Sequence, residues 1–164
     1  PMRECWAVML ALEQNTELDF DGAFVNDSSL SWISKNSSKP GRSQNPESWV
    51  LHASSDWSHQ NLERSAETVA EELLQAFTVA TGLASLKIER AVAHRWRYAL
   101  PPEPLAASCV FDGERKIGCC GDWCGGPRVE GAFLSGMAAA GRVLGLLDCK
   151  GDPIVAGESQ KTLF

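Results

Sequence analysis

The sequence lacks the features that would direct a chain into a membrane or out of the cell. No apolar run approaches the roughly eighteen residues of a membrane-spanning helix, and no secretory signal is visible. We therefore expect a cytoplasmic protein with no membrane partner. A run rich in lysine and arginine is also missing, and the net charge is -6 with a pI near 5.1. These values disfavour binding to a phosphate backbone, so nucleic acid is excluded as an expected partner.

Several catalytic and metal-binding patterns are missing as well. The three histidines have no H-E-x-x-H spacing, and no serine lies in a G-x-S-x-G turn. The six cysteines contain no C-x-x-C pair, so we predict no metal site and expect the thiols to pack as small hydrophobic groups. The G-x-G-x-x-G turn that holds a dinucleotide pyrophosphate is absent too. The sequence therefore leaves the catalytic residues unknown.

The residues that are present predict an α+β fold whose strands form a sheet with one antiparallel hairpin. The chain has 164 residues, of which 44% are hydrophobic, and this is enough for a sizeable core. The turn at 26–29 should join two short strands in a hairpin. We expect Ser55 to cap a short helix, and a cover helix to run from Ser65 until Gly82 stops it. The predicted strands of this sheet are 4–13, 22–25, 30–34, 49–53 and 86–100.

A strand, a glycine-rich turn and a helix follow one another near the end of the chain. Residues 116–120 suit a short buried strand, and 129–147 suit a helix rich in small residues that a flat ligand could approach closely. We expect the first helical N–H groups, from Val129 to Ala132, to lack intrahelical acceptors and to face an anion or a polar ring edge. Asp122 is placed to accept hydrogen bonds from sugar or polyol hydroxyls. The alternative is that Asp122 only caps a turn, which the glycines only close.

The same residues resemble a known family. Gly121-Asp122-Trp123, then 126–132 and the Ser-Gly pair at 135–136, closely resemble the C-terminal flavin motif of the flavin-dependent amine oxidase superfamily, above all its renalase-like bacterial branch. Blocks at 6–10, 30–33, 36–42, 49–53 and 93–99 also resemble the second half of that branch, so the resemblance covers roughly 4–147. It implies an oxidoreductase with noncovalent FAD. The implied cofactor-binding residues are Gly121, Asp122, Trp123, Val129, Glu130, Gly131 and Ala132.

The resemblance also implies how the chain is divided. Residues 3–112 would form the substrate-binding domain, with an antiparallel sheet and cover helices. Residues 113–148 would supply the returning strand and final helix of an FAD-binding, Rossmann-like domain, and 149–164 a tail. Because the G-x-G-x-x-G turn is missing, we expect the C-terminal half of an enzyme, either truncated or an incomplete gene product. Its expected partners are the missing N-terminal FAD-binding half and a further copy of the chain, through exposed apolar surface. The isolated chain should be inactive.

Two substrate classes follow from the resemblance. Renalase-like enzymes oxidise isomers of NAD(P)H by hydride transfer to flavin and then to dioxygen, whereas amine oxidases hold an amine between two aromatic rings, usually tyrosines. Tyr98 is the one tyrosine here, although Trp96 or another tryptophan could replace the second ring. The substrate-binding candidates are Trp96, Tyr98 and Arg42, with Lys39, Arg95 and Arg97 as further cations for a phosphate.

The blander alternatives are that the two aromatic residues belong to the core and that Arg42 lies in a solvated loop. A third function remains open as well, namely a binding or interaction domain that kept the fold and lost the cofactor.

Overall fold

The chain forms two compact units that meet at a proline-rich segment. The computed structural model describes residues 2–148, and the division falls between Pro102 and Glu103. The sequence analysis placed its domain boundary later, after residue 112. The expected tail, 149–164, lies outside the described residues, as does Cys149.

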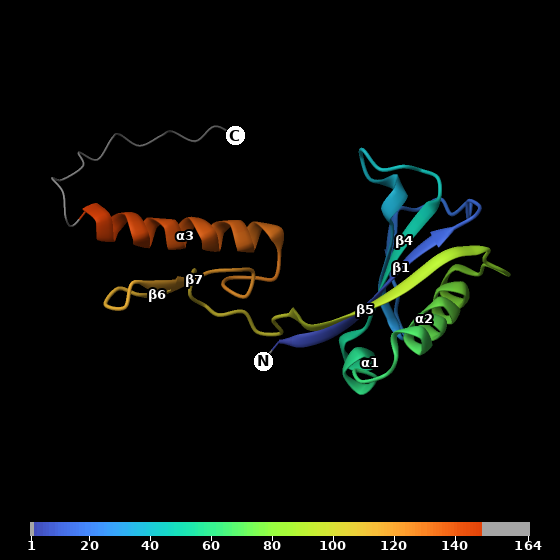
Figure 1. Ribbon diagram of the computed structural model, residues 1–164, viewed down its shortest axis with the longest axis horizontal. Helices are drawn as coiled ribbons and strands as arrows, with labels where there is room; N and C mark the ends of the chain where they lie inside the picture. The colour runs from blue at the N-terminus through green and yellow to red at the C-terminus, as the bar shows by residue number, and fades with distance from the viewer. Residues whose placement is uncertain (1, 149–164) are drawn as a thin grey trace. The chain divides into compact units, whose positions relative to one another are not determined.

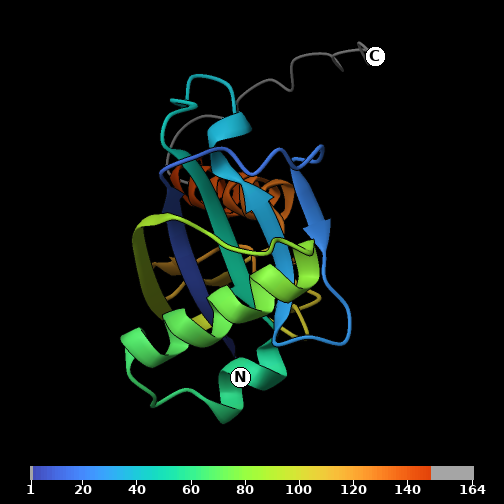
Figure 2. The ribbon, with the colours of Figure 1, turned by 90° about the vertical axis from the view of Figure 1, so that its right-hand side faces the viewer.

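The first unit is an antiparallel sheet with helices, as the sequence predicted. Its five strands lie in the order β2-β3-β4-β1-β5, and β1, near the middle, pairs with both β4 and β5. Helix α2 lies across one face of this sheet (Figure 2). The elements, labelled in Figure 1, are β1 (Arg3–Leu12), β2 (Gly22–Phe24), β3 (Leu30–Lys35), η1 (Asn36–Ser38), β4 (Glu47–Ala53), α1 (Ser55–Gln60), α2 (Ala66–Thr81) and β5 (Ile88–Leu100).

The core lies between α2 and one face of the sheet. Alternate residues of β1 point to this side because side chains of a strand alternate between its faces. Side chains that recur along one side of α2 meet these β1 residues and are fully buried. The ring centroid of Phe77, on α2, lies 5.3 Å from that of Trp49. The principal core residues are Trp6, Val8, Leu10, Leu12, Ile33, Trp49, Leu51, Val69, Leu73 and Phe77.

Serine hydroxyls set the starts of the two helices. Ser65 caps α2 by accepting a hydrogen bond from the Thr68 N–H at 3.2 Å, and Gly82, with φ +72°, ends that helix as predicted. The prediction that Ser55 caps α1 was wrong by one residue. Ser54 has the extended backbone of a cap and accepts from the Trp57 N–H at 3.3 Å, whereas Ser55 is already helical.

A buried carboxylate joins two strands to the connection that follows β1. The Glu47 side chain accepts hydrogen bonds at 2.6 Å from both the Thr16 hydroxyl and the Trp49 indole N–H, and the Lys35 ammonium lies 3.7 Å away. Burial raises the pKa of Glu47, but the hydrogen bonds from Thr16 and Trp49 and the charge of Lys35 outweigh it, so the pKa is below its usual value. The ionised form therefore stabilises the fold.

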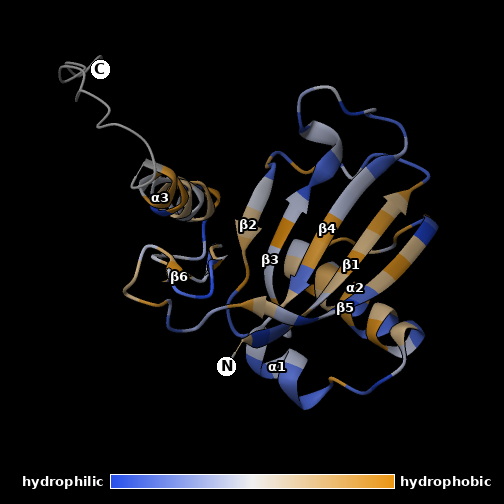
Figure 3. Ribbon diagram, turned by 60° about the vertical axis from the view of Figure 1, so that its left-hand side comes forward, coloured by the Kyte–Doolittle hydropathy of each residue, from blue (hydrophilic) through white to orange (hydrophobic). Residues whose placement is uncertain are grey.

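The second unit contains a two-stranded ribbon and a long helix. β6 (Val110–Asp112) pairs antiparallel with β7 (Ile117–Cys119), and α3 runs over Val129–Asp148. The expectation of a buried strand at 116–120 was wrong, because β7 pairs only with β6 among the described residues and Ile117 stays 59% exposed. Helix α3 carries many hydrophobic residues, drawn in orange in Figure 3, and most of them are exposed. Within residues 2–148, no helix combines the length and apolar character needed to cross a membrane.

We predict that Glu47→Gln destabilises the first unit by about 1 to 3 kcal/mol. The glutamine amide oxygen can replace Oε1, but its nitrogen cannot accept the Thr16 backbone N–H that Oε2 accepts at 3.2 Å, and the charge facing Lys35 is lost. The pKa of Glu47 is lower in the folded state than in the unfolded state, where it is about 4.3. Ionised Glu47 therefore adds to the free energy of unfolding above about pH 4.3, and this stabilisation is lost as the pH falls through the folded-state pKa. The variant should therefore lose less stability than wild type on acidification below about pH 4.3. Urea unfolding at pH 7 and at acidic pH measures both effects. Glu13→Gln, at an exposed position, is the control, and equal stability of all three proteins would contradict the prediction.

Candidate functional site

The loop that leads into α3, residues 121–131, is held from two sides. The Leu105 N–H donates to the Trp123 carbonyl at 2.8 Å, and the Gly125 N–H donates to the Leu105 carbonyl at 3.0 Å. From α3, the buried Ser135 hydroxyl accepts from the Gly121 N–H at 3.1 Å and donates to the Ser108 carbonyl at 2.6 Å. These bonds fix the loop against both the preceding segment and the helix. We call it the helix-start loop.

Glycines allow the helix-start loop to turn tightly. Gly125 and Gly126 have φ values of +83° and +144°, where side chains are strongly disfavoured. A Cβ on Gly131 would collide with the carbonyl oxygen of Gly126. The sequence analysis related the small residues of this helix to the approach of a flat ligand, whereas at 131 it is the loop backbone that passes directly against the first turn of α3.

The first turn of α3 offers hydrogen-bond donors. Among the described residues, no acceptor takes the N–H groups of Val129, Glu130 and Gly131. The expectation that Ala132 also lacks an intrahelical acceptor was wrong: its N–H donates to the Arg128 carbonyl at 3.0 Å, so Arg128 is the N-cap residue. Three donors rather than four thus lie at the positive end of the helix dipole.

The other predicted cofactor residues lie in the same loop. Asp122 is half-buried, and its carboxylate makes no hydrogen bond or ion pair with the described residues. Trp123 is half-buried beside Gly121, where an added Cβ would lie 2.8 Å from Cδ1 of the indole. Gly121 gives its N–H to Ser135. The loop therefore combines one carboxylate acceptor and three N–H donors, a set suited to a ligand with hydroxyl groups and a polar ring edge.

In the first unit, the sheet face opposite α2 carries the predicted aromatic residues. The register pairs Cys5 with Trp96 and Met9 with Val92, so these side chains share a face, which we call the open face. Tyr98 follows Trp96 by two residues on the same side, and the two are 79% and 54% exposed. Neither residue belongs to the core, so the alternative interpretation that the sequence left open, in which both rings are core residues, was wrong. The His94 ring packs edge-on against Trp96 with the ring centroids 4.6 Å apart, and both Trp96 and Tyr98 keep more than half of their surface accessible.

The cations predicted from the sequence are not brought together. Arg95 and Arg97 lie on the other face and both pair with Glu63, at 3.0 and 2.7 Å. The bond with Arg97 and the charges of both arginines hold the pKa of Glu63 below its usual value. Arg42 lies in the exposed loop between η1 and β4. Burial, and after it the charge of Lys39, holds the pKa of His52, a half-buried residue of β4, below its usual value.

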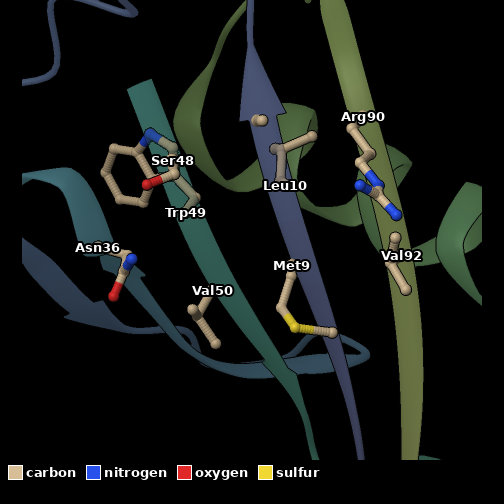
Figure 4. Close-up of a pocket in the computed structure, with 9 residues that line it drawn as sticks. Met9, Leu10, Asn36, Ser48, Trp49, Val50, Arg90 and Val92 are labelled. Carbon is tan, nitrogen blue, oxygen red and sulfur yellow. The ribbon is translucent and has the colours of Figure 1, made fainter. Parts of the chain in front are cut away.

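A hollow of about 530 Å³ lies on the open face. Figure 4 shows Met9, Val50 and Val92 side by side, with Arg90 at one edge and Asn36 at the other. The sequence analysis did not single out Arg90 or Asn36. The signal for Arg90 was available, because it alternates in step with Val92, His94 and Trp96 along the predicted strand. The residues that line the hollow are Met9, Leu10, Ala11, Asn36, Ser48, Trp49, Val50, Arg90 and Val92.

No protein-family model matches the chain. Among solved structures, the chain is similar to the crystal structure of a putative protoporphyrinogen oxidase from Exiguobacterium sp. 255-15, with a TM-score of 0.67 and 15% sequence identity. The two proteins share a fold. The match covers 92% of this chain but only 36% of the other, so this chain spans little more than a third of that oxidase's length. At this identity the likeness concerns architecture, and function has to be argued from the residues.

We predict that Gly131→Ala disrupts the helix-start loop, because the new methyl group meets the Gly126 carbonyl oxygen. Gly141→Ala is the matched control: an added Cβ there meets nothing within 4 Å, so it should strengthen α3 by about 0.5 to 1 kcal/mol. Amide hydrogen exchange along α3 distinguishes the two. The first variant should exchange faster around residues 131–135, and the second no faster than wild type. Equal exchange in both variants would show that the close approach at Gly131 is unimportant.

Proposed function

We propose that this chain is the C-terminal part of an FAD-dependent oxidoreductase whose flavin is held by the helix-start loop. The observation that carries the proposal is the first turn of α3, where three N–H donors have no acceptor among the described residues and lie beside a glycine turn. The resemblance of 121–136 to the flavin motif of the amine oxidase superfamily supports it, and so does the fold shared with a protein named as an oxidase.

The chemistry of the donor set fits a flavin. The pyrimidine edge of the ring carries carbonyl acceptors, which suit the N–H groups of Val129, Glu130 and Gly131. Asp122, whose carboxylate has no partner among the described residues, suits a hydroxyl of the ribityl chain. Trp123 and Ala132 would contribute shape rather than hydrogen bonds. The absence of a Cβ at Gly131 lets the Gly126 backbone lie against the first turn of α3, which sets the shape of the loop.

Bound FAD would supply the redox chemistry, accepting a hydride from the substrate and passing electrons to dioxygen. The chain's own contribution is electrostatic. The N–H groups of Val129, Glu130 and Gly131 are fixed by the helix, so they need not reorganise as negative charge develops beside them. Ser135 and Leu105 position the loop through the bonds described above. These residues therefore favour the reduced state of the cofactor.

We further propose a dihydronicotinamide substrate of the NAD(P)H isomer class. The open face exposes the aromatic rings of Trp96 and Tyr98, on which a flat heterocycle can stack. The chain has a single tyrosine, which does not favour a paired-tyrosine amine site. The proposal also requires a partner that supplies a G-x-G-x-x-G turn, because no such turn lies in these residues. It places the protein in the cytoplasm and lets the exposed apolar side chains of α3 contact that partner or a second copy.

We predict that a protein carrying both halves is reduced rapidly by the 2- and 6-dihydro isomers of NAD(P)H. Simple monoamines and polyamines should reduce it at least about a hundredfold more slowly, because their cationic form has no carboxylate partner in the hollow. Anaerobic stopped-flow bleaching of the flavin gives the rate for each compound, with ordinary 1,4-NAD(P)H as the control. Faster reduction by any amine would overturn the substrate class but leave the flavin assignment standing. A protein that binds no flavin would overturn both.

A further inference from the structure

We propose that the hollow on the open face is a binding site for a flat apolar molecule carrying one anionic group, with Arg90 as the residue that selects the anion. The proposal rests on the proposed function for the natural substrate, an anionic dihydronicotinamide compound. It adds a specificity-determining residue that neither the motif nor the fold likeness assigns.

The floor of the hollow is apolar. Met9, on β1, lies between Val50 of β4 and Val92 of β5, and the register pairs it with both. Met9 and Val92 remain 46% and 39% exposed, so they gain by contact with an apolar ring. An unbranched thioether also adapts its shape to a flat ligand. The floor therefore binds the ring, whatever its charge.

Arg90 supplies the charge at one edge. Four other arginines of the first unit are each within 4 Å of a carboxylate: Arg3, Arg64, Arg95 and Arg97. Arg90 has no such partner and no side-chain hydrogen bond among the described residues, although it lines the hollow (Figure 4). Its guanidinium can therefore pair with an incoming carboxylate or phosphate without breaking an existing contact.

The rest of the lining excludes cations rather than attracting them. Asn36 and Ser48 are neutral, and no Asp or Glu lines the hollow. Among the described residues, Arg90 is the one charged residue of the lining. A protonated amine entering the hollow would lose hydration and meet the like charge of Arg90. Arg90 thus explains why an anion is preferred to an amine on the same apolar floor.

Three naphthalene derivatives that share one ring system test this directly: 1-naphthyl phosphate, 1-naphthol and 1-naphthylmethylamine. Each is titrated into the full chain labelled with ¹³C on its methionine methyl groups. The Met9 resonance, assigned with Met9→Leu, reports binding at the hollow, while Met137 reports the second unit. We expect the phosphate to bind about tenfold more tightly than the naphthol, and the amine to bind most weakly. Arg90→Gln should remove the preference for the phosphate and leave the naphthol unchanged, whereas Arg90→Glu should favour the amine.

Lys87→Gln, which removes one exposed cation outside the hollow, is the control and should retain the preference. The inference is overturned if the phosphate leaves the Met9 resonance unmoved, if it binds no better than the naphthol, or if the two Gln variants lose the preference equally. Since these titrations need no flavin, their failure leaves the flavin assignment untouched. A protein with both halves that binds no flavin would, conversely, leave the anion site standing.

Discussion

Burial of a single face of the sheet is the constraint on which the first unit depends. The rings of Trp49 and Phe77 pack between the sheet and α2, and the side chains on that face of β1 are almost completely removed from water. Side chains of a strand alternate between its two faces, so the residues that adjoin each core residue in the sequence point to the opposite face. A shift by one residue would expose Val8 and Leu10, so the register is strongly specified. The open face, with Met9, Val92 and Trp96, is the necessary counterpart of the core.

The helix-start loop obeys a second, local constraint. The backbone of Gly126 passes so close to Gly131 that no side chain fits between them, and Ser135 ties the loop to the helix one turn later. This arrangement fixes the loop while leaving the first three N–H groups of α3 without an acceptor among residues 2–148. Unsatisfied donors at a helix start are ordinary when they meet water, but here they occur with a glycine turn and with Asp122, whose carboxylate has no partner among the same residues. That combination is what favours a cofactor site over a simple turn.

The sequence predicted features set by local periodicity and turn chemistry. The strands of the first unit, the cover helix ended by Gly82, and α3 from Val129 all follow from spacing and stop residues, whereas β6 was not predicted. It failed where long-range pairing decides. The strand at 116–120 was expected to be buried because its residues are mostly small or apolar, but among the described residues β7 pairs with β6 alone, and it stays exposed. Ser55 was expected as the cap of α1, but the backbone dihedral angles, which the sequence does not give, make Ser54 the cap.

The site was predicted in the same uneven way. Residues 121–132 are contiguous, so a motif can find them, and only Ala132 proved to have an intrahelical acceptor. The hollow on the open face is lined by residues of four elements, β1, η1, β4 and β5. The candidate cations could not be assigned to one face or the other without the strand register. Arg95 and Arg97 pair with Glu63 on the face opposite the open face, whereas Arg90, which the sequence analysis did not single out, lines the hollow. The alternation of side chains along β5 separates Arg90 from Arg95 and Arg97. Only the pairing of β5 with β1 shows which of these two sets faces away from α2.

The central claim is that the N–H groups at the start of α3 hold a flavin. Amide hydrogen exchange at Val129, Glu130 and Gly131, measured in a protein carrying both halves with and without FAD, tests it most directly. We expect FAD to slow exchange of these three amides at least about tenfold, since each would gain an acceptor, and to leave the core amides of α2 unchanged. Bound FAD with no change at these three positions would contradict the account.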